Sequence, residues 1–153
     1  MATKTITLEK ALVDPESAYL YACRVVRDRW PQGESVIAQD IEYSYYYARF
    51  LESQWFVNEF GYVGAPAVIE TTVAQSPLYA YLYATEVIRA RWPQGEPAIA
   101  RGPYAYWYAR EIIKHRWPAA EPTIVCSDKA VDYLHYFQKE FTKAEEIVWL
   151  LKQ

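Results

Sequence analysis

Three copies of one short motif place a glutamate at matching positions, and this row of carboxylates is the first feature that could do chemistry. The motif reads RWPQGE, RWPQGE and RWPAAE, and its copies end at Glu34, Glu96 and Glu121. On a shared face, three carboxylates could bind cations or a basic partner. The structural alternative is an acid at the start of a helix, favoured by the helix dipole and paired with an arginine of a neighbouring unit. We favour the structural interpretation.

The tyrosines that precede the motif are the second candidate, because their rings could bind another protein. Of the 15 tyrosines in the chain, 12 lie in four groups with spacings of one or two residues. Consecutive helical positions lie about 100° apart, so one helix cannot bury every ring of such a set. The rings could simply cover grooves between helices, but interfaces are enriched in Tyr, Trp and Arg. We therefore predict a protein-binding surface formed by Tyr19, Tyr45, Tyr81, Tyr106, Arg27, Arg89 and Lys114.

The same composition permits binding of single-stranded nucleic acid, since bases stack on aromatic rings and cations attract phosphates. The positive groove would be formed by Arg24, Arg27, Arg29, Arg89, Arg91, Arg110, Lys114 and Arg116. The net charge of −3 and the acids that recur beside these cations argue against this function. We rank it second to protein binding.

No catalytic or metal-binding constellation emerges from the sequence. It contains no glycine-rich phosphate loop, no nucleophile elbow and no zinc-ligand spacing. His115 and His135 have no ligand partner nearby in the sequence, and Cys23 and Cys126 are isolated. We expect a protein that is not an enzyme and that uses neither a cofactor nor a metal.

The hexapeptide belongs to a longer tandem repeat. Eight residues before each tryptophan stands an alanine preceded by tyrosine, and the spacing from Trp92 to Trp117 indicates a unit of roughly 25 residues. Two copies are degenerate: one has Trp55 a residue early and precedes an insertion near 59–68, and the last retains Phe141. We predict one domain over 1–153, with a half unit at 7–13 and units at about 14–39, 40–75, 76–101, 102–126 and 127–150.

Each unit is predicted to contain two short helices. Asp14-Pro15 and Ser76-Pro77 are helix-start signals, and small residues four apart let a neighbouring helix approach closely. The basic residues ahead of the motif would lie in the last turn of the first helix. The motif tryptophan would be the last core anchor of that helix, the proline would open the second helix, and the glutamate would lie in its first turn. These structural residues are Trp30, Pro31, Glu34, Trp92, Pro93, Glu96, Trp117, Pro118 and Glu121.

Helix pairs of this kind cannot bury their apolar faces alone, so about five of them should pack on one another. The predicted fold is all-α: tandem short helix-pair repeats stacked as a compact array or a short solenoid. The more apolar last segment, AEEIVWLLKQ, is expected to close the stack.

The composition is that of a globular domain, with 52% hydrophobic and 23% charged residues. The start, MATKTITLEKAL, has no apolar signal-peptide region, and no apolar run approaches the roughly 20 residues that span a bilayer. We expect a soluble, cytoplasmic protein with no membrane partner.

The unit Tyr-Ala, six residues, then Arg-Trp-Pro-x-x-Glu resembles a short tandem α-helical repeat of bacteriophage and viral proteins. YLYACRVVRDRWPQGE, YLYATEVIRARWPQGE and YWYAREIIKHRWPAAE carry the resemblance, which covers residues 9–148. It implies a small helical protein made in the cytoplasm of an infected bacterium, where it binds a host or defence protein. We therefore expect a phage-encoded modulator or inhibitor of such a factor. A homo-oligomer is a variant, since aromatic faces can self-associate.

Overall fold

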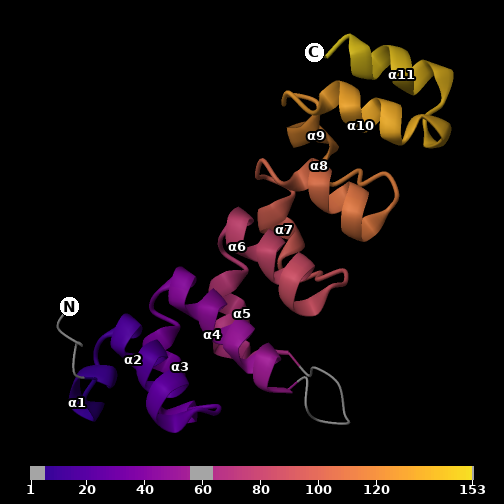
Figure 1. Cartoon of the computed structure of the whole chain (residues 1–153). Coiled ribbons are helices and arrows are strands. Elements are labelled where there is room, and N and C mark those ends of the chain that lie inside the picture. The colour runs from indigo at the N-terminus through magenta and orange to yellow at the C-terminus, as the bar shows by residue number, and fades with distance from the viewer. Residues whose placement is uncertain (1–5, 56–63, 153) are drawn as a thin grey trace, which may run out of the picture.

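The computed structural model describes residues 6–55 and 64–152, and all regular structure within these ranges is helical. Figure 1 shows an elongated molecule whose helices follow one another in chain order, from α1 (Leu8–Ala11) at one end to α11 (Lys143–Leu150) at the other. The all-α prediction is confirmed for this part of the chain.

Most helices are short, and α4 is the longest with 15 residues. Between α1 and α11 the α-helices are α2 Pro15–Tyr21, α3 Pro31–Ile37, α4 Ile41–Trp55, α5 Ala67–Val73, α6 Pro77–Leu82, α7 Glu96–Ile99, α8 Ala105–Tyr108, α9 Glu121–Ile124 and α10 Ala130–Tyr136. Helices α2, α6 and α8 continue into π-helical turns at Ala22–Val26, Tyr83–Ile88 and Ala109–Ile113, and a 3₁₀ turn covers Gln138–Glu140. We term α2, α4, α6, α8 and α10 the first helices, and α3, α5, α7, α9 and α11 the second helices.

The core combines small residues of the first helices with aliphatic residues of the second helices. The alanine and serine pairs four residues apart on the first helices and their π-helical turns are all buried, and α2 packs on α4. Ile37, Ile99 and Ile124 of the second helices are buried as well. The predicted helix starts are confirmed, since the side chains of Asp14 and Ser76 accept backbone N–H groups of the first turns of α2 and α6.

Three first helices, α2, α6 and α8, widen into a π-helical turn and stop at a left-handed residue. The Arg27 N–H reaches the Ala22 carbonyl at 2.7 Å, and the Lys114 N–H reaches the Ala109 carbonyl at 2.7 Å. The φ angles of Arg27, Arg89 and Lys114 are 58°, 55° and 62°, a conformation that costs a residue with a Cβ about 1–2 kcal/mol. The expectation that all basic residues ahead of the motif lie in the last helical turn is therefore wrong.

The motif covers the linker after the first helix and the residues that lead into the second helix. Its tryptophans are buried as predicted, although each follows the first helix and none ends it. Pro31 opens α3 as predicted, but Pro93 and Pro118 lie in turns, and α7 and α9 begin only at Glu96 and Glu121. A second proline follows each of these two glutamates. Pro97 and Pro122 are the second residues of α7 and α9, in the first turn, where the missing N–H needs no helical acceptor.

Each motif tryptophan packs between a tyrosine and the motif itself. The ring of Trp30 lies 4.9 Å from that of Tyr21, which belongs to the preceding Tyr-Ala pair. The same ring covers Gly33 so closely that a Cβ there would overlap it. The glycine of the motif is therefore required by a close approach in this copy. In the RWPAAE copy, a buried alanine, Ala120, takes the place of the glycine.

A tyrosine of the following first helix accepts the backbone N–H of the motif tryptophan. The Trp92 N–H donates to the Tyr108 hydroxyl at 2.8 Å, and that hydroxyl donates in turn to Glu96 at 3.3 Å. We term this arrangement the tyrosine latch, because it joins one helix pair to the next. Two further copies join Tyr47 to Trp30 and Glu34, and Tyr133 to Trp117 and Glu121.

The glutamate of each latch is also held by the arginine of its own motif. Arg91 donates two hydrogen bonds to Glu96, at 2.6 and 3.1 Å. The equivalent pairs are Arg29–Glu34 and Arg116–Glu121. The expectation that these acids pair with an arginine of a neighbouring unit is wrong, because the neighbouring unit supplies the tyrosine. Two-pronged arginine binding and a tyrosine hydroxyl together compensate for the burial of the carboxylate.

The degenerate second unit forms the same latch with different residues. The Ala65 N–H donates to the Tyr83 hydroxyl at 3.1 Å, and that hydroxyl donates to Glu70 at 2.6 Å. Ala65-Pro66 therefore takes the place assigned to Trp55, which lies in α4 and whose side chain falls outside the described residues. Residues 59–63, half of the predicted insertion, also lie outside them.

Trp149 anchors the last unit in place of a motif tryptophan. Its ring stacks on Tyr133 at 5.3 Å, and its indole N–H donates to the Ala130 carbonyl at 3.0 Å. Four large side chains at the outer surface of this segment are exposed: Ile147, Val148, Leu150 and Leu151. The expected closing helix is present, but its outer surface is apolar.

Replacing Lys114 by glycine should stabilise the fold relative to Lys114→Ala, because only glycine adopts a positive φ without steric cost. We expect the free energy of unfolding of the glycine variant to exceed that of the alanine variant by about 1 kcal/mol. Urea unfolding followed by circular dichroism measures both. The alanine variant is the matched control, since it shortens the side chain but keeps the Cβ. A glycine variant no more stable than alanine would contradict the strain at this position.

Tyr108→Phe should lower the free energy of unfolding by about 1–3 kcal/mol, because the buried Trp92 N–H loses its acceptor. Tyr104→Phe is the control on a ring that takes no part in a latch and stacks on Tyr81. It should change the stability by less than about 0.5 kcal/mol. Equal losses in the two variants, measured by urea unfolding, would show that the latch contributes nothing specific.

Candidate functional site

The predicted binding tyrosines separate into two groups. Tyr45 and Tyr106 are buried, with exposed fractions of 3% and 5%, whereas Tyr19 and Tyr81 are half-buried. All four occupy the same position on α2, α4, α6 and α8, two residues before the tyrosine of the Tyr-Ala pair. Adjacent helices cover Tyr45 and Tyr106, so these two rings offer almost no surface to a partner. Tyr19 and Tyr81 keep accessible ring surface.

A second set of hydrogen bonds joins two of these tyrosines to the π-helical turn that follows the next first helix. The Tyr45 hydroxyl donates to Glu86 at 2.9 Å, and the Tyr81 hydroxyl donates to Glu111 at 2.9 Å. Burial, with a contribution from these hydrogen bonds, raises the pKa of Tyr45 and of Tyr81 to about 12. Neither glutamate was among the site residues predicted from the sequence. Their recurrence three residues after a latch tyrosine was a signal that could have identified them.

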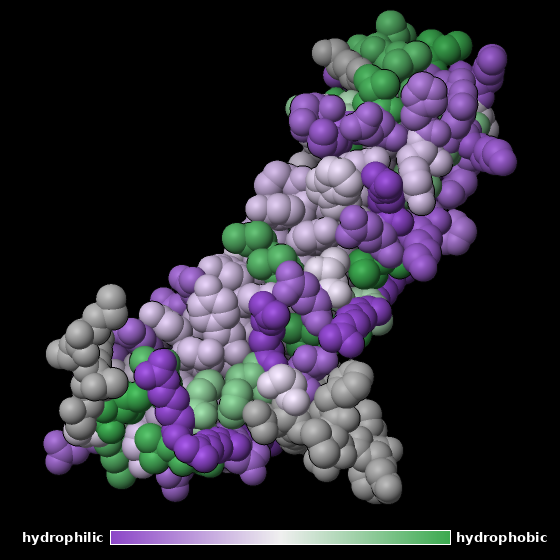
Figure 2. Space-filling model, in the orientation of Figure 1, coloured by the Kyte–Doolittle hydropathy of each residue, from purple (hydrophilic) through white to green (hydrophobic). Residues whose placement is uncertain are grey.

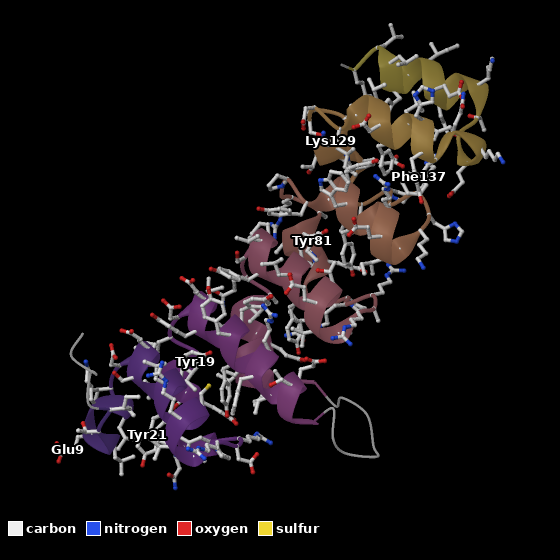
Figure 3. All side chains as sticks on the ribbon, viewed as in Figure 1. Glu9, Tyr19, Tyr21, Tyr81, Lys129 and Phe137 are labelled. Atoms are coloured by element: carbon white, nitrogen blue, oxygen red, sulfur yellow. The ribbon has the colours of Figure 1, made fainter. Side chains whose placement is uncertain are left out.

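Several of the rings that stay accessible lie along α2, α4 and α6 and at the start of α8. Tyr19 lies 5.9 Å from Tyr43 and 6.1 Å from Tyr46, and farther along the chain Tyr81 stacks on Tyr104 at 5.2 Å. We term this set the aromatic stripe: Tyr19, Tyr43, Tyr46, Tyr79, Tyr81, Tyr104 and Trp107. Figure 2 shows a pale band of intermediate hydropathy along the middle of one face, in the region where Figure 3 labels Tyr19 and Tyr81.

The predicted basic residues lie apart from these rings. Arg27, Arg89 and Lys114 are the exposed left-handed residues that end the first helices, and Arg89 pairs with Glu52 at 3.2 Å. Within the described part of the chain, none of the three lies over an aromatic ring. The structure therefore does not bring the predicted cations together with the predicted tyrosines.

Other arginines do contact aromatic rings. The guanidinium of Arg49 lies 5.8 Å from the centre of the Tyr45 ring. That of Arg110 lies 5.6 Å from the Trp107 ring and 5.3 Å from the Tyr136 ring. The protein-binding prediction included neither arginine, because their proximity to the rings depends on how successive helices pack.

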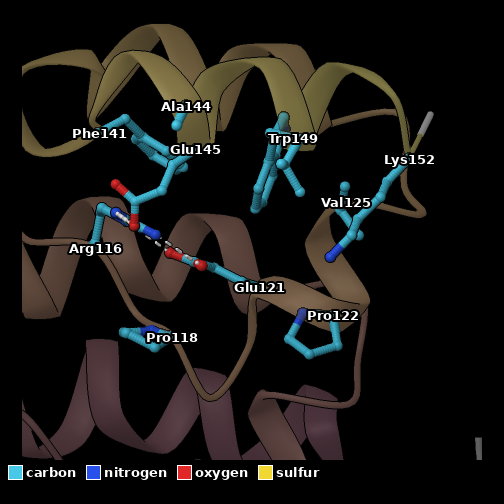
Figure 4. Close-up of a pocket in the computed structure, with 11 residues that line it drawn as sticks. Arg116, Pro118, Glu121, Pro122, Val125, Phe141, Ala144, Glu145, Trp149 and Lys152 are labelled. Carbon is cyan, nitrogen blue, oxygen red and sulfur yellow. Dashed lines mark hydrogen bonds and ion pairs between the residues drawn. The ribbon is translucent and has the colours of Figure 1, made fainter.

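A pocket of about 440 Å³ lies between α9 and α11 (Figure 4). Phe141 and Trp149 form part of its apolar wall. Arg116 lines it as well, paired with Glu121 at 2.8 Å and Glu145 at 3.0 Å and placed 3.7 Å from the centre of the Phe141 ring. The charges of Arg116, Glu121 and Glu145 therefore compensate one another within the pocket.

Metal-binding and reactive groups are not clustered in the described ranges. Within residues 6–55 and 64–152, no three metal-ligating side chains come together, and no helix has the length and hydropathy of a membrane span. His115 is exposed, 3.6 Å from Glu140. Burial raises the pKa of the Cys23 thiol to about 11, which disfavours the reactive thiolate.

Comparison with known proteins gives no relative. No family model, no curated protein and no solved structure matches this chain. The aromatic stripe is therefore the main basis for a functional proposal.

Raising the pH above about 10 should unfold the protein, because the buried latch tyrosines resist ionisation. Burial raises the pKa of Tyr47 and Tyr108 from 10.0 to about 12, and it raises the pKa of Tyr133 further. The unfolded chain loses its tyrosine protons first, so this stability is intact below pH 10.0 and falls as the pH approaches 12.

Tyrosinate absorbance and circular dichroism, recorded in one alkaline titration, measure this effect. Ionisation of the buried tyrosines should coincide with loss of helix. Complete ionisation near the ordinary tyrosine pKa with helix retained would contradict the burial of the latch.

Proposed function

We propose that this chain is a non-enzymatic protein-binding module whose contact surface is the aromatic stripe. The observation that carries the proposal is the row of accessible rings contributed by successive first helices. Tyrosine and tryptophan rings supply a large contact area with few rotatable bonds, which is why interfaces and binding loops are rich in them.

The rings of the stripe are held in place in the free protein. The Tyr46 hydroxyl donates to Glu42 at 2.7 Å, and the Tyr81 hydroxyl donates to Glu111 at 2.9 Å. A ring that is already fixed loses less side-chain entropy when a partner binds, so more of the contact energy becomes affinity. The fixed positions of the Tyr46 and Tyr81 rings therefore support the use of the stripe as a recognition surface.

Single-stranded nucleic acid is a weaker candidate for the same surface. The hydroxyls of Tyr46 and Tyr81 point to carboxylates, and the chain carries a net charge of −3. Phosphates would be repelled along the stripe. Several cations expected to form a positive groove are neutralised, since Arg29, Arg91 and Arg116 pair with motif glutamates.

We also propose that the helix pairs form a short solenoid of about five units. In support, four tyrosine latches, through Tyr47, Tyr83, Tyr108 and Tyr133, join five successive pairs. Stacked repeats create extended surfaces, so this architecture would align the rings of successive units.

The resemblance to phage repeat proteins supports a partner of bacterial origin. We propose a host or defence protein that this chain modulates or inhibits in the bacterial cytoplasm. Self-association through the stripe is a variant of the same proposal, since accessible aromatic faces can pair with copies of themselves.

Removing three accessible rings should weaken partner binding strongly. The variant Tyr46→Ser/Tyr79→Ser/Tyr104→Ser retains the latch tyrosines and should keep the helical circular dichroism spectrum. Immobilised wild-type chain should enrich a specific protein from a bacterial lysate, and the variant should lose it. With that partner purified, titration calorimetry should show affinity weakened by at least tenfold, on the order of one or two hot-spot residues.

The control removes exposed apolar residues from outside the stripe. Leu12 lies just after α1 and Val68 lies in α5, and both are exposed. Leu12→Ser/Val68→Ser should bind the partner as the wild type does. The proposal fails if no protein is enriched, or if the stripe variant and the control bind equally well.

A further inference from the structure

The first rings of the aromatic stripe form a compact cluster. Tyr19, Tyr43 and Tyr46 lie within 5.9 to 6.4 Å of one another, and their planes are tilted or edge-on. Tyr43 and Tyr19 are half-buried and Tyr46 is exposed, so ring faces remain open to solvent. The negative face of an aromatic ring attracts cations, most strongly a guanidinium group.

Carboxylates border this cluster. Glu42 accepts the Tyr46 hydroxyl at 2.7 Å, and Asp40 accepts the Tyr43 backbone N–H at 3.0 Å. Burial, followed by the charges of Glu16, Asp40, Glu42 and Asp14, raises the pKa of Tyr43. Rings and negative charges therefore act at the same place on the surface.

Elsewhere in this chain, arginines occupy sites made of a ring and a carboxylate. Arg49 lies 5.8 Å from the centre of the Tyr45 ring and 3.3 Å from Glu86. Arg116 lies over the ring of Phe141 in the same way, with Glu121 and Glu145 as its acids. In both places, the group that binds beside the ring and the carboxylate is a guanidinium.

The cluster at Tyr19, Tyr43 and Tyr46 has no such arginine within the described residues. None of the ion pairs there involves Asp40 or Glu42, and no arginine lies over these three rings. Arg24 affects Tyr19 through its charge but makes no ion pair with either acid in that part of the chain. A guanidinium from another molecule would complete the arrangement.

We propose that this cluster docks an arginine side chain of the protein partner, in an arginine-bearing segment that crosses the start of the stripe. The inference rests on the proposed protein-binding function and assigns the chemistry of the partner at this point. The guanidinium stacks on the tyrosine rings while Asp40 and Glu42 neutralise its charge. Arginine fits better than lysine, because its planar group stacks and donates two parallel hydrogen bonds.

A blocked peptide, acetyl-Gly-Arg-Gly-Arg-Gly-amide, tests the inference with the full chain at low salt. Nuclear magnetic resonance should show saturable shifts of the ring protons of Tyr19, Tyr43 and Tyr46. The same peptide with citrulline in place of arginine keeps the shape and removes the charge, so it should not saturate. The lysine peptide should bind more weakly than the arginine peptide.

Neutralising the two acids tests their role without removing hydrogen-bond acceptors. Asp40→Asn/Glu42→Gln should weaken arginine-peptide binding about fivefold, as expected for two exposed ion pairs. The matched control, Asp128→Asn/Asp132→Asn, removes two charges that pair with Lys129 and should leave binding unchanged.

Equal binding of the citrulline or lysine peptide, or unchanged affinity in Asp40→Asn/Glu42→Gln, would overturn the inference. Shifts confined to other rings would overturn it as well. If the arginine peptide fails while the stripe variant still loses a lysate partner, only this inference fails. If the peptide binds here but the stripe variant keeps its partner, the partner does not use the stripe, and both proposals fail.

Discussion

A single buried backbone N–H organises each junction between helix pairs. The chain leaves three of the first helices at a left-handed residue, and the N–H of the motif tryptophan then points to no helical acceptor. A buried N–H without an acceptor costs free energy, so the next helix must supply one. The hydroxyl of a latch tyrosine does so, and its own proton requires a second acceptor. The motif glutamate provides that acceptor, and the burial of its carboxylate is compensated by the motif arginine.

The latch explains why arginine, tryptophan, glutamate and a distant tyrosine recur together. Burial of the tryptophan N–H requires the tyrosine hydroxyl, the hydroxyl proton requires the glutamate, and the buried carboxylate requires the arginine. The tyrosine belongs to the following helix pair, so the hydrogen bonds also set how closely two pairs approach. Where the motif is degenerate, as at Ala65 and Glu70, the backbone N–H, the hydroxyl and the carboxylate are all still present. The latch therefore depends on these groups and does not require the tryptophan ring.

The position of the latch tyrosine also decides which other rings stay accessible. Once Tyr47 or Tyr108 points into the core, rings elsewhere on the same helix must lie at its flanks, and some of them form the aromatic stripe. Carboxylates accept the hydroxyls of Tyr46 and Tyr81, which fixes these two rings and gives the stripe a negative character. A surface of this kind suits a protein partner with cationic side chains better than a polyanion.

Local patterns in the sequence determined the helical character of this protein, the helix starts at Asp14 and Ser76, and the burial of the motif tryptophans and of Ile37, Ile99 and Ile124. Spacing of small and apolar residues and capping chemistry act within a few residues, so they are visible in the sequence alone. The second proline after Glu96 and Glu121 was also visible, but the pattern alone did not show which of the two prolines lies in the helix.

Only the tertiary structure decided which tyrosines are accessible and which acids they meet. Tyr45 and Tyr106 share a sequence position with Tyr19 and Tyr81, yet the first two are buried and the other two are not. The difference arises from the side chains that the next helix presents. The hydrogen bonds from a backbone N–H to a latch tyrosine join residues 16 to 18 positions apart. Exposure and long-range hydrogen bonding depend on how two helices pack. Tyrosines at equivalent positions of the repeat therefore meet different neighbours in different units.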